Sequence, residues 1–204
     1  MTRLPVAPGV FLWRGYFSKP AQQALLGEVF AGLQTAPLYR PVMPGSGKAF
    51  SVEESNFGEL GWVADQSGYR YQKTHPVTGL PWPAIPKALT DLWQAIGETP
   101  LCLQCCLVNL YRGKARMGLH QDKDEAALAA PVISVSLGDD ALFRIGAATR
   151  GGPTKSLTLQ SGDVLRFGGP ARLAYHGIDR IVPGSSTLVP GGGRINLTLR
   201  RVTS

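Results

Sequence analysis

From residue 101 onward, apolar side chains recur at every second position of the chain. Ile133, Val135 and Leu137 alternate with two serines, and the segment 194–200 alternates four polar residues with three apolar ones. A period of two predicts β-strands, because successive side chains of a strand point to opposite faces of the sheet. The pattern predicts about seven or eight strands in this half of the chain.

Two glycine-containing turns separate pairs of these strands. The turn 138–140 (Gly-Asp-Asp) follows the strand at 133–137, and the turn 161–163 (Ser-Gly-Asp) follows the strand at 157–159. Short turns of this composition are typical of β-hairpins. We therefore expect each of the two strands to form a hairpin with the strand that comes next.

Two helices are expected before the strands. Ser18 can cap a helix over 18–33 and Pro20 fits its first turn, whereas a shorter second helix follows Pro86. The apolar faces are Leu25, Leu26, Val29, Phe30 and Leu33 in the first helix, and Leu89, Leu92, Trp93 and Ile96 in the second. The segment 37–83 has no sustained period, so it is expected to form loops with short extended pieces.

These patterns together predict one domain that is mainly β with flanking helices. The chain has 204 residues, of which 25 are glycine and 16 are proline, and this excess of turn formers favours many short strands. Helices packed on a two-sheet sandwich, a jelly roll (double-stranded β-helix), is the expected fold. A closed barrel and an immunoglobulin-like sandwich remain alternatives.

The composition excludes a disordered chain and favours a polyanionic partner. Hydrophobic residues make up 44% of the chain, and 21 basic against 14 acidic residues give a net charge of +7. No apolar run approaches the ~20 residues of a membrane span, and the N-terminus lacks the apolar core of a signal peptide. The three cysteines lie within 102–106 and form no disulfide framework. We expect a cytoplasmic protein with structural cysteines and no membrane partner.

The most informative polar pattern is a histidine two residues before an aspartate. His120 and Asp122 would project to the same side of an extended backbone. Adding one distant imidazole gives two nitrogens and one oxygen, which is the ligand set of non-haem Fe(II) sites with open positions. Taken alone, the pair is more typical of an ordinary surface contact. His75 precedes a proline and is expected in a loop.

The last strand offers a second polar pattern. Arg194, Asn196, Thr198 and Arg200 share one strand face. Beside a metal, such a face suits a dicarboxylate, because a guanidinium can grip a carboxylate with two parallel hydrogen bonds. Asn109 and Tyr111, also two residues apart, would add an amide and a phenol. A solvated basic face and a core tyrosine are the alternatives.

These motifs resemble the AlkB family of 2-oxoglutarate/Fe(II)-dependent dioxygenases. The resemblance is carried in order, from about residue 10 to residue 202, by Leu60-Gly-Trp62, Gly68-Tyr-Arg-Tyr71, Pro81-Trp-Pro-Ala84, Gly118-Leu-His-Gln-Asp-Lys-Asp-Glu125, Tyr175-His-Gly-Ile178 and Arg194-Ile-Asn-Leu-Thr-Leu-Arg200. It implies a jelly-roll catalytic core over about 101–202. It also implies a nucleotide-recognition lid over about 37–83.

The resemblance also implies roles for individual residues, with no catalytic side chain beyond the metal ligands. The expected iron ligands are His120, Asp122 and His176; the expected 2-oxoglutarate contacts are Asn109, Tyr111, Arg194, Asn196 and Arg200; the expected substrate contacts are Trp62, Tyr69, Tyr71, Asp124 and Arg150. Arg200 is expected to hold the far carboxylate of the cosubstrate. Two departures from the family pattern, Gly151-Gly-Pro153 beside Arg150 and the acidic pair Glu53-Glu54 in the lid, leave the substrate range open.

The implied reaction is oxidative demethylation of N-alkylated bases in DNA, of the 1-methyladenine and 3-methylcytosine type. It uses Fe(II), 2-oxoglutarate and O2 and releases formaldehyde, succinate and CO2, reversing alkylation damage directly. The expected partner is alkylated DNA, single-stranded or with a flipped base, and the protein is expected to be a monomer. The alternatives are the same chemistry on RNA, protein or a small molecule, and a jelly roll that binds nucleic acid without turnover.

Overall fold

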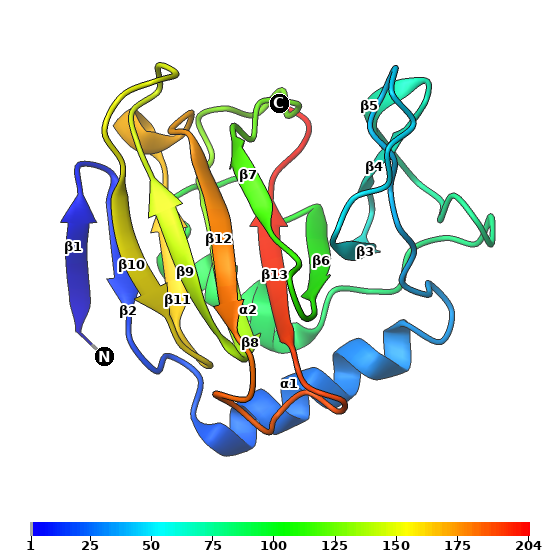
Figure 1. The fold of residues 1–204 in the computed structure, drawn as a ribbon, viewed down its shortest axis with the longest axis horizontal. Helices are drawn as coiled ribbons and strands as arrows, with labels where there is room; N and C mark the ends of the chain where they lie inside the picture. The colour runs from blue at the N-terminus through cyan, green and yellow to red at the C-terminus, as the bar shows by residue number, and fades with distance from the viewer. Residues whose placement is uncertain (1) are drawn as a thin grey trace.

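Two antiparallel β-sheets and two helices build the protein, as seen in a computed structural model that describes residues 2–204 (Figure 1). The larger sheet holds seven strands in the order β1 (Arg3–Ala7), β2 (Val10–Trp13), β11 (Val164–Phe167), β8 (Val132–Gly138), β13 (Arg194–Arg200), β6 (Cys105–Tyr111) and β3 (Glu53–Gly58). The smaller sheet holds four strands in the order β10 (Lys155–Leu159), β9 (Asp140–Ile145), β12 (His176–Val182) and β7 (Met117–His120). A separate hairpin joins β4 (Gly61–Asp65) to β5 (Gly68–Gln72) and stands to one side of the sandwich.

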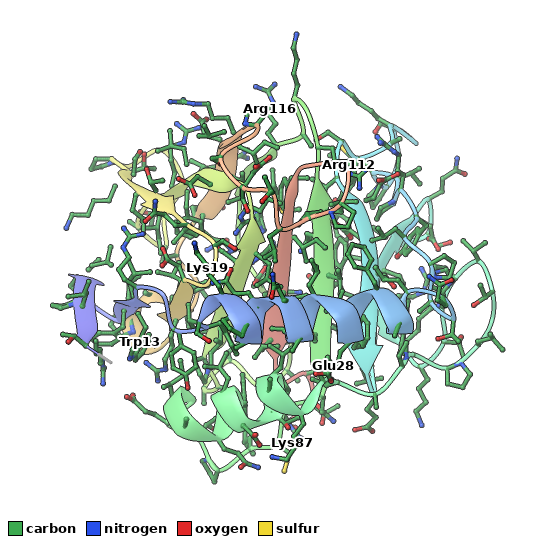
Figure 2. The ribbon with its side chains drawn as sticks, turned by 90° about the horizontal axis from the view of Figure 1, so that it is seen from below. Trp13, Lys19, Glu28, Lys87, Arg112 and Arg116 are labelled. Carbon is green, nitrogen blue, oxygen red and sulfur yellow. The ribbon has the colours of Figure 1, made fainter. Side chains whose placement is uncertain are left out.

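The two sheets face each other, and the helices cover the outer face of the larger sheet. Figure 2 shows α1 (Lys19–Gly32) and α2 (Lys87–Ile96) lying side by side across its strands. One hydrophobic cluster joins the helices to β6, β8 and β13, and a second cluster lies between the sheets. A single 3-10 turn, η1 (Gly169–Ala171), precedes β12. This arrangement confirms the predicted jelly-roll layout with flanking helices.

Both predicted helices are confirmed with their local signals. The side chain of Ser18 accepts a hydrogen bond from the backbone N–H of Ala21, and Pro20 lies in the first turn of α1. The buried residues Leu25, Leu26 and Val29 form the inner face of α1, and Leu89, Leu92 and Trp93 form that of α2. Neither helix within residues 2–204 has the length and apolar character that crossing a membrane requires.

The two predicted hairpins are wrong. The turn after β8 delivers the chain to β9 in the other sheet, and the turn between β10 and β11 likewise changes sheets. Gly138 and Gly162 do adopt positive φ angles, of 92° and 86°. A turn signal predicts that the chain reverses, but it does not say which strand becomes the hydrogen-bonded neighbour. In a jelly roll the reversal carries the chain across the core.

The N-terminal half holds strands that the sequence did not indicate. β1 and β2 extend the larger sheet, and β3 forms its opposite edge beside β6. β3 begins Glu-Glu-Ser-Asn and lacks apolar alternation, because its inner face lines the polar interior described below. β6 begins at Cys105, so of the three cysteines Cys102 lies before the strand and is exposed, whereas Cys105 and Cys106 are buried in it.

His75 lies in a loop, as expected, yet its ring is buried. Its Nδ1 accepts hydrogen bonds from the backbone N–H groups of Val77 and Thr78, each at 3.1 Å. Its Nε2 then donates to the carbonyl of Pro37 at 2.8 Å. The imidazole therefore organises the turn that carries residues 75–80, and it lies apart from the other two histidines.

Candidate metal centre and its surroundings

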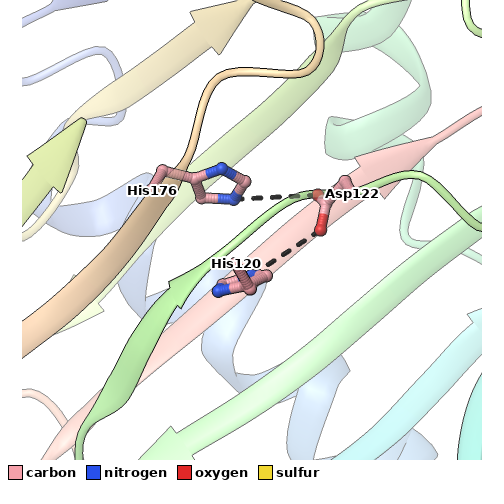
Figure 3. Close-up of side chains that lie close together, drawn as sticks. All are labelled: His120, Asp122 and His176. Carbon is pink, nitrogen blue, oxygen red and sulfur yellow. Dashed lines mark ion pairs between the residues drawn. The ribbon is translucent and has the colours of Figure 1, made fainter. Parts of the chain in front are cut away.

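Three side chains converge at the open edge of the smaller sheet. His120 ends β7, Asp122 follows two residues later, and His176 begins β12 directly opposite His120. The Nε2 atom of His120 lies 3.7 Å from Asp122 Oδ1, and that of His176 lies 3.9 Å from Asp122 Oδ2 (Figure 3). One ligand atom from each residue lies within 4.8 Å of the others.

Hydrogen bonds on the far side of each ring set its tautomer. Nδ1 of His120 lies 2.9 Å from the carbonyl oxygen of Gly118, and Nδ1 of His176 lies 2.9 Å from that of Ala174. Since a carbonyl oxygen only accepts, each Nδ1 carries the proton and each Nε2 presents a lone pair. Histidines that bind metals are oriented in this way. The donor set therefore fits a divalent cation.

The carboxylate of Asp122 is held in its ionised form. Burial alone would raise its pKa, but the positive charge of Arg200 holds the pKa of Asp122 well below its usual range. Arg200 donates from Nε at 3.1 Å and from Nη2 at 2.8 Å, both to Oδ2. Burial next to His120 lowers the pKa of His176 to about 4, which keeps its imidazole neutral at physiological pH.

Two imidazoles and one carboxylate on one side of a metal leave the opposite positions open. This is the arrangement of non-haem Fe(II) oxygenases, in which the remaining positions accept a chelating cosubstrate and O2. The three predicted ligands come from β7, from the loop after it and from β12. The structure brings them together as the sequence pattern required.

Arg194 is a buried cation with free hydrogen-bonding capacity on the inner face of β13. Its side chain is 1% exposed, and its guanidinium carbon lies 5.3 Å from the ring centroid of Tyr111. Nη2 donates to Ser136 Oγ at 3.0 Å, whereas Nε and Nη1 have no partner within residues 2–204. A buried cation with two unpartnered donors is costly unless an anion meets it. The site therefore fits a carboxylate group of a dicarboxylic ligand.

This geometry changes the roles that we expect for Arg194 and Arg200. Arg200 was expected to hold the far carboxylate of the cosubstrate, but two of its nitrogens already bind Asp122. Its remaining nitrogen, Nη1, lies 3.3 Å from the hydroxyl of Tyr71. Both arginines lie on the same face of β13, six residues apart, and only their neighbours distinguish them.

The other predicted cosubstrate contacts line the same inner face. Asn109 on β6 is directly opposite Asn196 on β13, and the next pair along the strands is Tyr111 and Arg194. Asn196 donates to Ser134 Oγ at 2.7 Å, whereas the side-chain oxygen of the buried Asn109 has no partner in the described chain. β13 is buried along its whole length, so its polar face is internal and not a solvated one.

The β4–β5 hairpin brings aromatic side chains to the metal centre. Trp62 and Tyr69 are stacked with ring centroids 5.4 Å apart, and Trp62 Nε1 donates to Asp124 at 2.9 Å. Tyr71 donates its hydroxyl hydrogen to Glu125 and also contacts Arg200. Four of the five predicted substrate contacts therefore lie next to one another.

Arg150 is the exception. It lies exposed in the connection between β9 and β10, and no hydrogen bond or ion pair of its side chain is seen within residues 2–204. That connection passes close to the metal centre, since Gln121 donates to the carbonyl of Ala148 at 3.0 Å. Arg150 lies two residues beyond this contact, on the exposed part of the connection.

The sequence did not indicate a buried ion pair beneath the metal ligands. Arg172 donates to Glu125 at 2.9 Å and to the backbone carbonyl of Asp122 at 2.5 Å. Glu125 is buried. The two residues are 47 positions apart, and no local pattern marks them as partners.

Comparison with known proteins agrees with this geometry. Residues 9–200 match the model of the 2OG-Fe(II) oxygenase superfamily. An alpha-ketoglutarate-dependent dioxygenase AlkB homolog of Caulobacter vibrioides is 57% identical over 97% of this chain and 90% of its own length. The Escherichia coli alpha-ketoglutarate-dependent dioxygenase AlkB is 39% identical over 97% of this chain and 92% of its own. The solved structure of OsALKBH1 superimposes with a TM-score of 0.82 and 31% identity, covering 98% of this chain and 100% of that one.

Proposed function

This chain belongs to the AlkB family within the 2OG-Fe(II) oxygenase superfamily, and on that premise we infer that it demethylates alkylated nucleobases by oxidation. The reaction consumes 2-oxoglutarate and O2 and yields formaldehyde, succinate and CO2. The observation that carries the inference is a His-Asp-His cluster with both Nε2 atoms unprotonated. A buried arginine, Arg194, whose Nε and Nη1 have no partner within residues 2–204, lies on the facing sheet.

The residues present fit both the metal and the cosubstrate. His120, Asp122 and His176 would hold Fe(II), which with bound 2-oxoglutarate and O2 supplies the oxidation of an N-methyl group. Each imidazole is oriented by its backbone carbonyl, and Arg200 keeps Asp122 ionised and in place. In this proposal the protein contributes position and charge, while the bound groups carry the oxidation.

Arg194 is our candidate for the far carboxylate of 2-oxoglutarate. Its Nε and Nη1 are unpartnered, and a guanidinium offers such neighbouring donors to both oxygens of one carboxylate. Asn109, Tyr111 and Asn196 lie beside it on the same face. Arg200 would contribute through Asp122 and through its remaining nitrogen, so it stays in the cosubstrate set in a different role.

The alkylated base would lie between the hairpin and the metal centre. Methylation of N1 of adenine or N3 of cytosine leaves a cationic ring that cannot pair, which makes the base easier to flip. Stacking on Trp62 or Tyr69 would then gain about 0.5–2 kcal/mol from the ring quadrupole. Asp124 adds a negative charge beside Trp62, and Tyr71 lies on the inner side of the base next to Arg200. The exposed Arg150 would suit a phosphate of the nucleic acid. In this proposal residues 37–83 form the lid and 101–202 the catalytic core.

The nature of the polymer is a finer part of the proposal. The net charge of +7 suits a phosphate backbone, and the stacked aromatic pair favours a base over a peptide. We propose single-stranded DNA or a flipped base as the substrate, with RNA as the alternative, acted on by a monomer in the cytoplasm. A binding module without turnover is disfavoured by the complete set of metal ligands.

Methylated oligonucleotides test this function. The purified protein, supplied with Fe(II), 2-oxoglutarate and ascorbate in air, should release formaldehyde and succinate with DNA that carries 3-methylcytosine or 1-methyladenine. His120→Ala should release neither, because it removes a metal ligand. RNA of the same sequence and the free nucleoside establish the polymer preference. Metal-loaded protein that binds the DNA but releases no formaldehyde would contradict the proposal.

A further inference from the structure

The acidic residue Glu54 lies inside the sandwich, beside the candidate cosubstrate contacts. It is the second residue of β3 and pairs directly with Asn109 of β6. Directly opposed residues of an antiparallel pair project to the same face, with Cβ atoms about 4.5–5.5 Å apart. Asn109 in turn is opposite Asn196, so Glu54 continues the polar row that crosses the larger sheet. Its backbone also pairs with that of Tyr39.

Glu54 is buried without a hydrogen-bond partner. Its side chain is 1% exposed, and neither carboxyl oxygen has a partner in the part of the chain that the structure describes. Burial raises the pKa of Glu54 to about 8, despite the opposing effect of the Arg200 charge. Tyr39, whose hydroxyl is also unpartnered, and Tyr111 are the titratable groups that sense its charge. A buried carboxyl without a hydrogen-bond partner costs free energy. We therefore expect that a group of a bound ligand forms the missing hydrogen bonds with Glu54.

Charge complementarity identifies the ligand that would meet it. 2-Oxoglutarate is a dianion and would be repelled by a carboxylate, and Arg194 already offers it free donors. Glu54 instead needs a hydrogen-bond donor or a positive charge. The alkylated base offers both when methylation leaves the ring cationic and an exocyclic amine stands next to the methylated nitrogen.

The placement of Glu54 agrees with a contact to the base. Asn56 lies two residues along β3 on the same face. Its side chain binds the backbone of Trp62 through both its oxygen, at 3.0 Å, and its nitrogen, at 2.9 Å. β3 lies between β6, which carries Asn109 and Tyr111, and the β4–β5 hairpin, which carries the stacked aromatic rings. Glu54 therefore lies between the candidate cosubstrate contacts and the candidate base contacts.

We propose that Glu54 is a specificity-determining residue that accepts a hydrogen bond from the exocyclic amine of a cationic alkylated base. This deepens the proposed function and rests on it. The positive charge of the methylated ring would stabilise the ionised form of Glu54, and its carboxylate would then form a charge-assisted hydrogen bond with the amine of 3-methylcytosine. The neutral 3-methylthymine offers only carbonyl oxygens and no positive charge, so a hydrogen bond to it from the protonated acid would be neutral and weaker. Glu54 thereby selects for ring-cation substrates at this site.

Glu53 provides a matched control within the same strand. It precedes Glu54 and projects to the opposite face, where its side chain is 35% exposed and lies 3.6 Å from Arg40. A Glu53→Gln substitution removes the same charge from the same segment without touching the interior. Any effect of bulk charge on nucleic-acid binding would therefore appear in both variants.

The decisive measurement is the ratio of kcat/KM for 3-methylcytosine to that for 3-methylthymine in one DNA sequence. Glu54→Gln should lower this ratio about five-fold, because a charge-assisted hydrogen bond becomes a neutral one and the amide can donate to the thymine carbonyl. Glu53→Gln should leave the ratio unchanged. An unchanged ratio in Glu54→Gln, or equal losses on both substrates, would overturn the assignment.

Binding separates this inference from the proposed function. The dissociation constants of metal-free wild-type and variant protein for the two oligonucleotides should shift in the same direction as the kinetic ratio. Glu54→Met replaces the acid by an apolar side chain of similar length. It should show the same loss of preference for 3-methylcytosine, and it should still unfold in a single thermal transition, which shows that the variant is folded. Wild-type protein that binds 3-methylcytosine preferentially but does not turn over would refute only the function. If wild-type protein turns over both substrates and the Glu54 variants keep its kcat/KM ratio of 3-methylcytosine to 3-methylthymine, only the inference is refuted.

Discussion

Arg194 and Arg200 lie at the two ends of one face of β13, but their side chains have different partners. Arg200 has two carboxylates nearby, and although burial opposes its charge, Asp122 and Glu125 raise its pKa well above the usual value. Arg194 forms no ion pair with an acidic side chain of residues 2–204, and burial lowers its pKa. The charge of Arg200 is balanced inside the protein, whereas that of Arg194 is available for a ligand.

The contrast predicts separable effects of two Arg→Lys substitutions. Arg194→Lys should weaken 2-oxoglutarate binding about ten-fold, because an ammonium cannot reproduce the paired donors of a guanidinium. Arg200→Lys should act mainly on metal affinity, through the loosened Asp122 carboxylate. Titration calorimetry measures the metal constant with Mn(II) added to metal-free protein and the cosubstrate constant with 2-oxoglutarate added to Mn(II)-loaded protein. Equal cosubstrate affinity in the wild type and Arg194→Lys would return the anchoring role to Arg200.

Glu54 should also make the stability of the protein depend on pH. Its pKa is about 8 in the folded chain and near the ordinary 4.5 in the unfolded chain, so the folded state retains a proton between these values. The free energy of unfolding should therefore fall as the pH rises through that window. Glu54→Gln removes this loss, so its melting temperature should exceed that of the wild type by more at pH 8 than at pH 5. Melting is followed by circular dichroism. An equal difference in melting temperature between Glu54→Gln and wild type at pH 5 and pH 8 would argue against a buried protonated acid.

At the scale of the element, the pairing of β12 with β7 sets the spacing of the metal ligands. His176 is opposite His120, and Gly177 follows at an irregularity of the ladder. A Cβ atom on Gly177 would lie 2.5 Å from the carbonyl oxygen of Met117 and 2.7 Å from that of Gly118. Both contacts are with backbone, which cannot move aside without separating the strands. The glycine after the histidine is thus required by close strand approach.

Gly177→Ala should therefore weaken metal binding about ten-fold or more, the range seen when groups that orient metal ligands are disturbed. The strand that carries His176 would be pushed away from the strand that carries His120. Gly118→Ala is a close control on the facing strand, since a Cβ there meets nothing within 4 Å. Competition with a fluorescent chelator gives both affinities. Similar losses in the two variants would indicate a general effect of alanine on the sheet.

At the scale of the whole molecule, the metal centre lies where three separate structural units meet. The smaller sheet carries His120 and His176, and the larger sheet supplies Arg200, which binds Asp122. The hairpin adds Tyr71, which binds both Arg200 and Glu125. These contacts join the two sheets and the hairpin through a single polar network. Events at the metal centre should therefore affect the stability of the whole chain.

Metal binding should raise the melting temperature of the protein as a single transition. A divalent ion at 100 times its dissociation constant adds about 2.7 kcal/mol to the free energy of unfolding, or roughly 5–10 °C for a chain of this size. Mn(II) serves as a redox-stable probe, and a chelator should reverse the shift. Asp122→Ala should show no comparable shift. A rise of the same size in that variant would place the ion elsewhere.

The sequence by itself determined the features that depend on neighbouring residues. The caps and apolar faces of α1 and α2, the alternation along β8 and β13, and the shared side of His120 and Asp122 all follow from local sequence, whereas His176 was assigned through the family resemblance. The motif order identified the family without coordinates. The sequence did not mark β3 as a core strand, because its buried residues Glu54, Ser55 and Asn56 are polar.

Only the tertiary structure decided which strands pair and which charges meet. The turns at Gly138 and Gly162 were visible, but the change of sheet was not, since hydrogen-bond partners are chosen by distant segments. The same holds for Arg200 beside Asp122, which is 78 residues away, and for Glu54, whose isolation depends on everything packed around it. Periodicity is a local property of the chain, whereas the ionisation and availability of a buried side chain are set by neighbours that only the fold supplies.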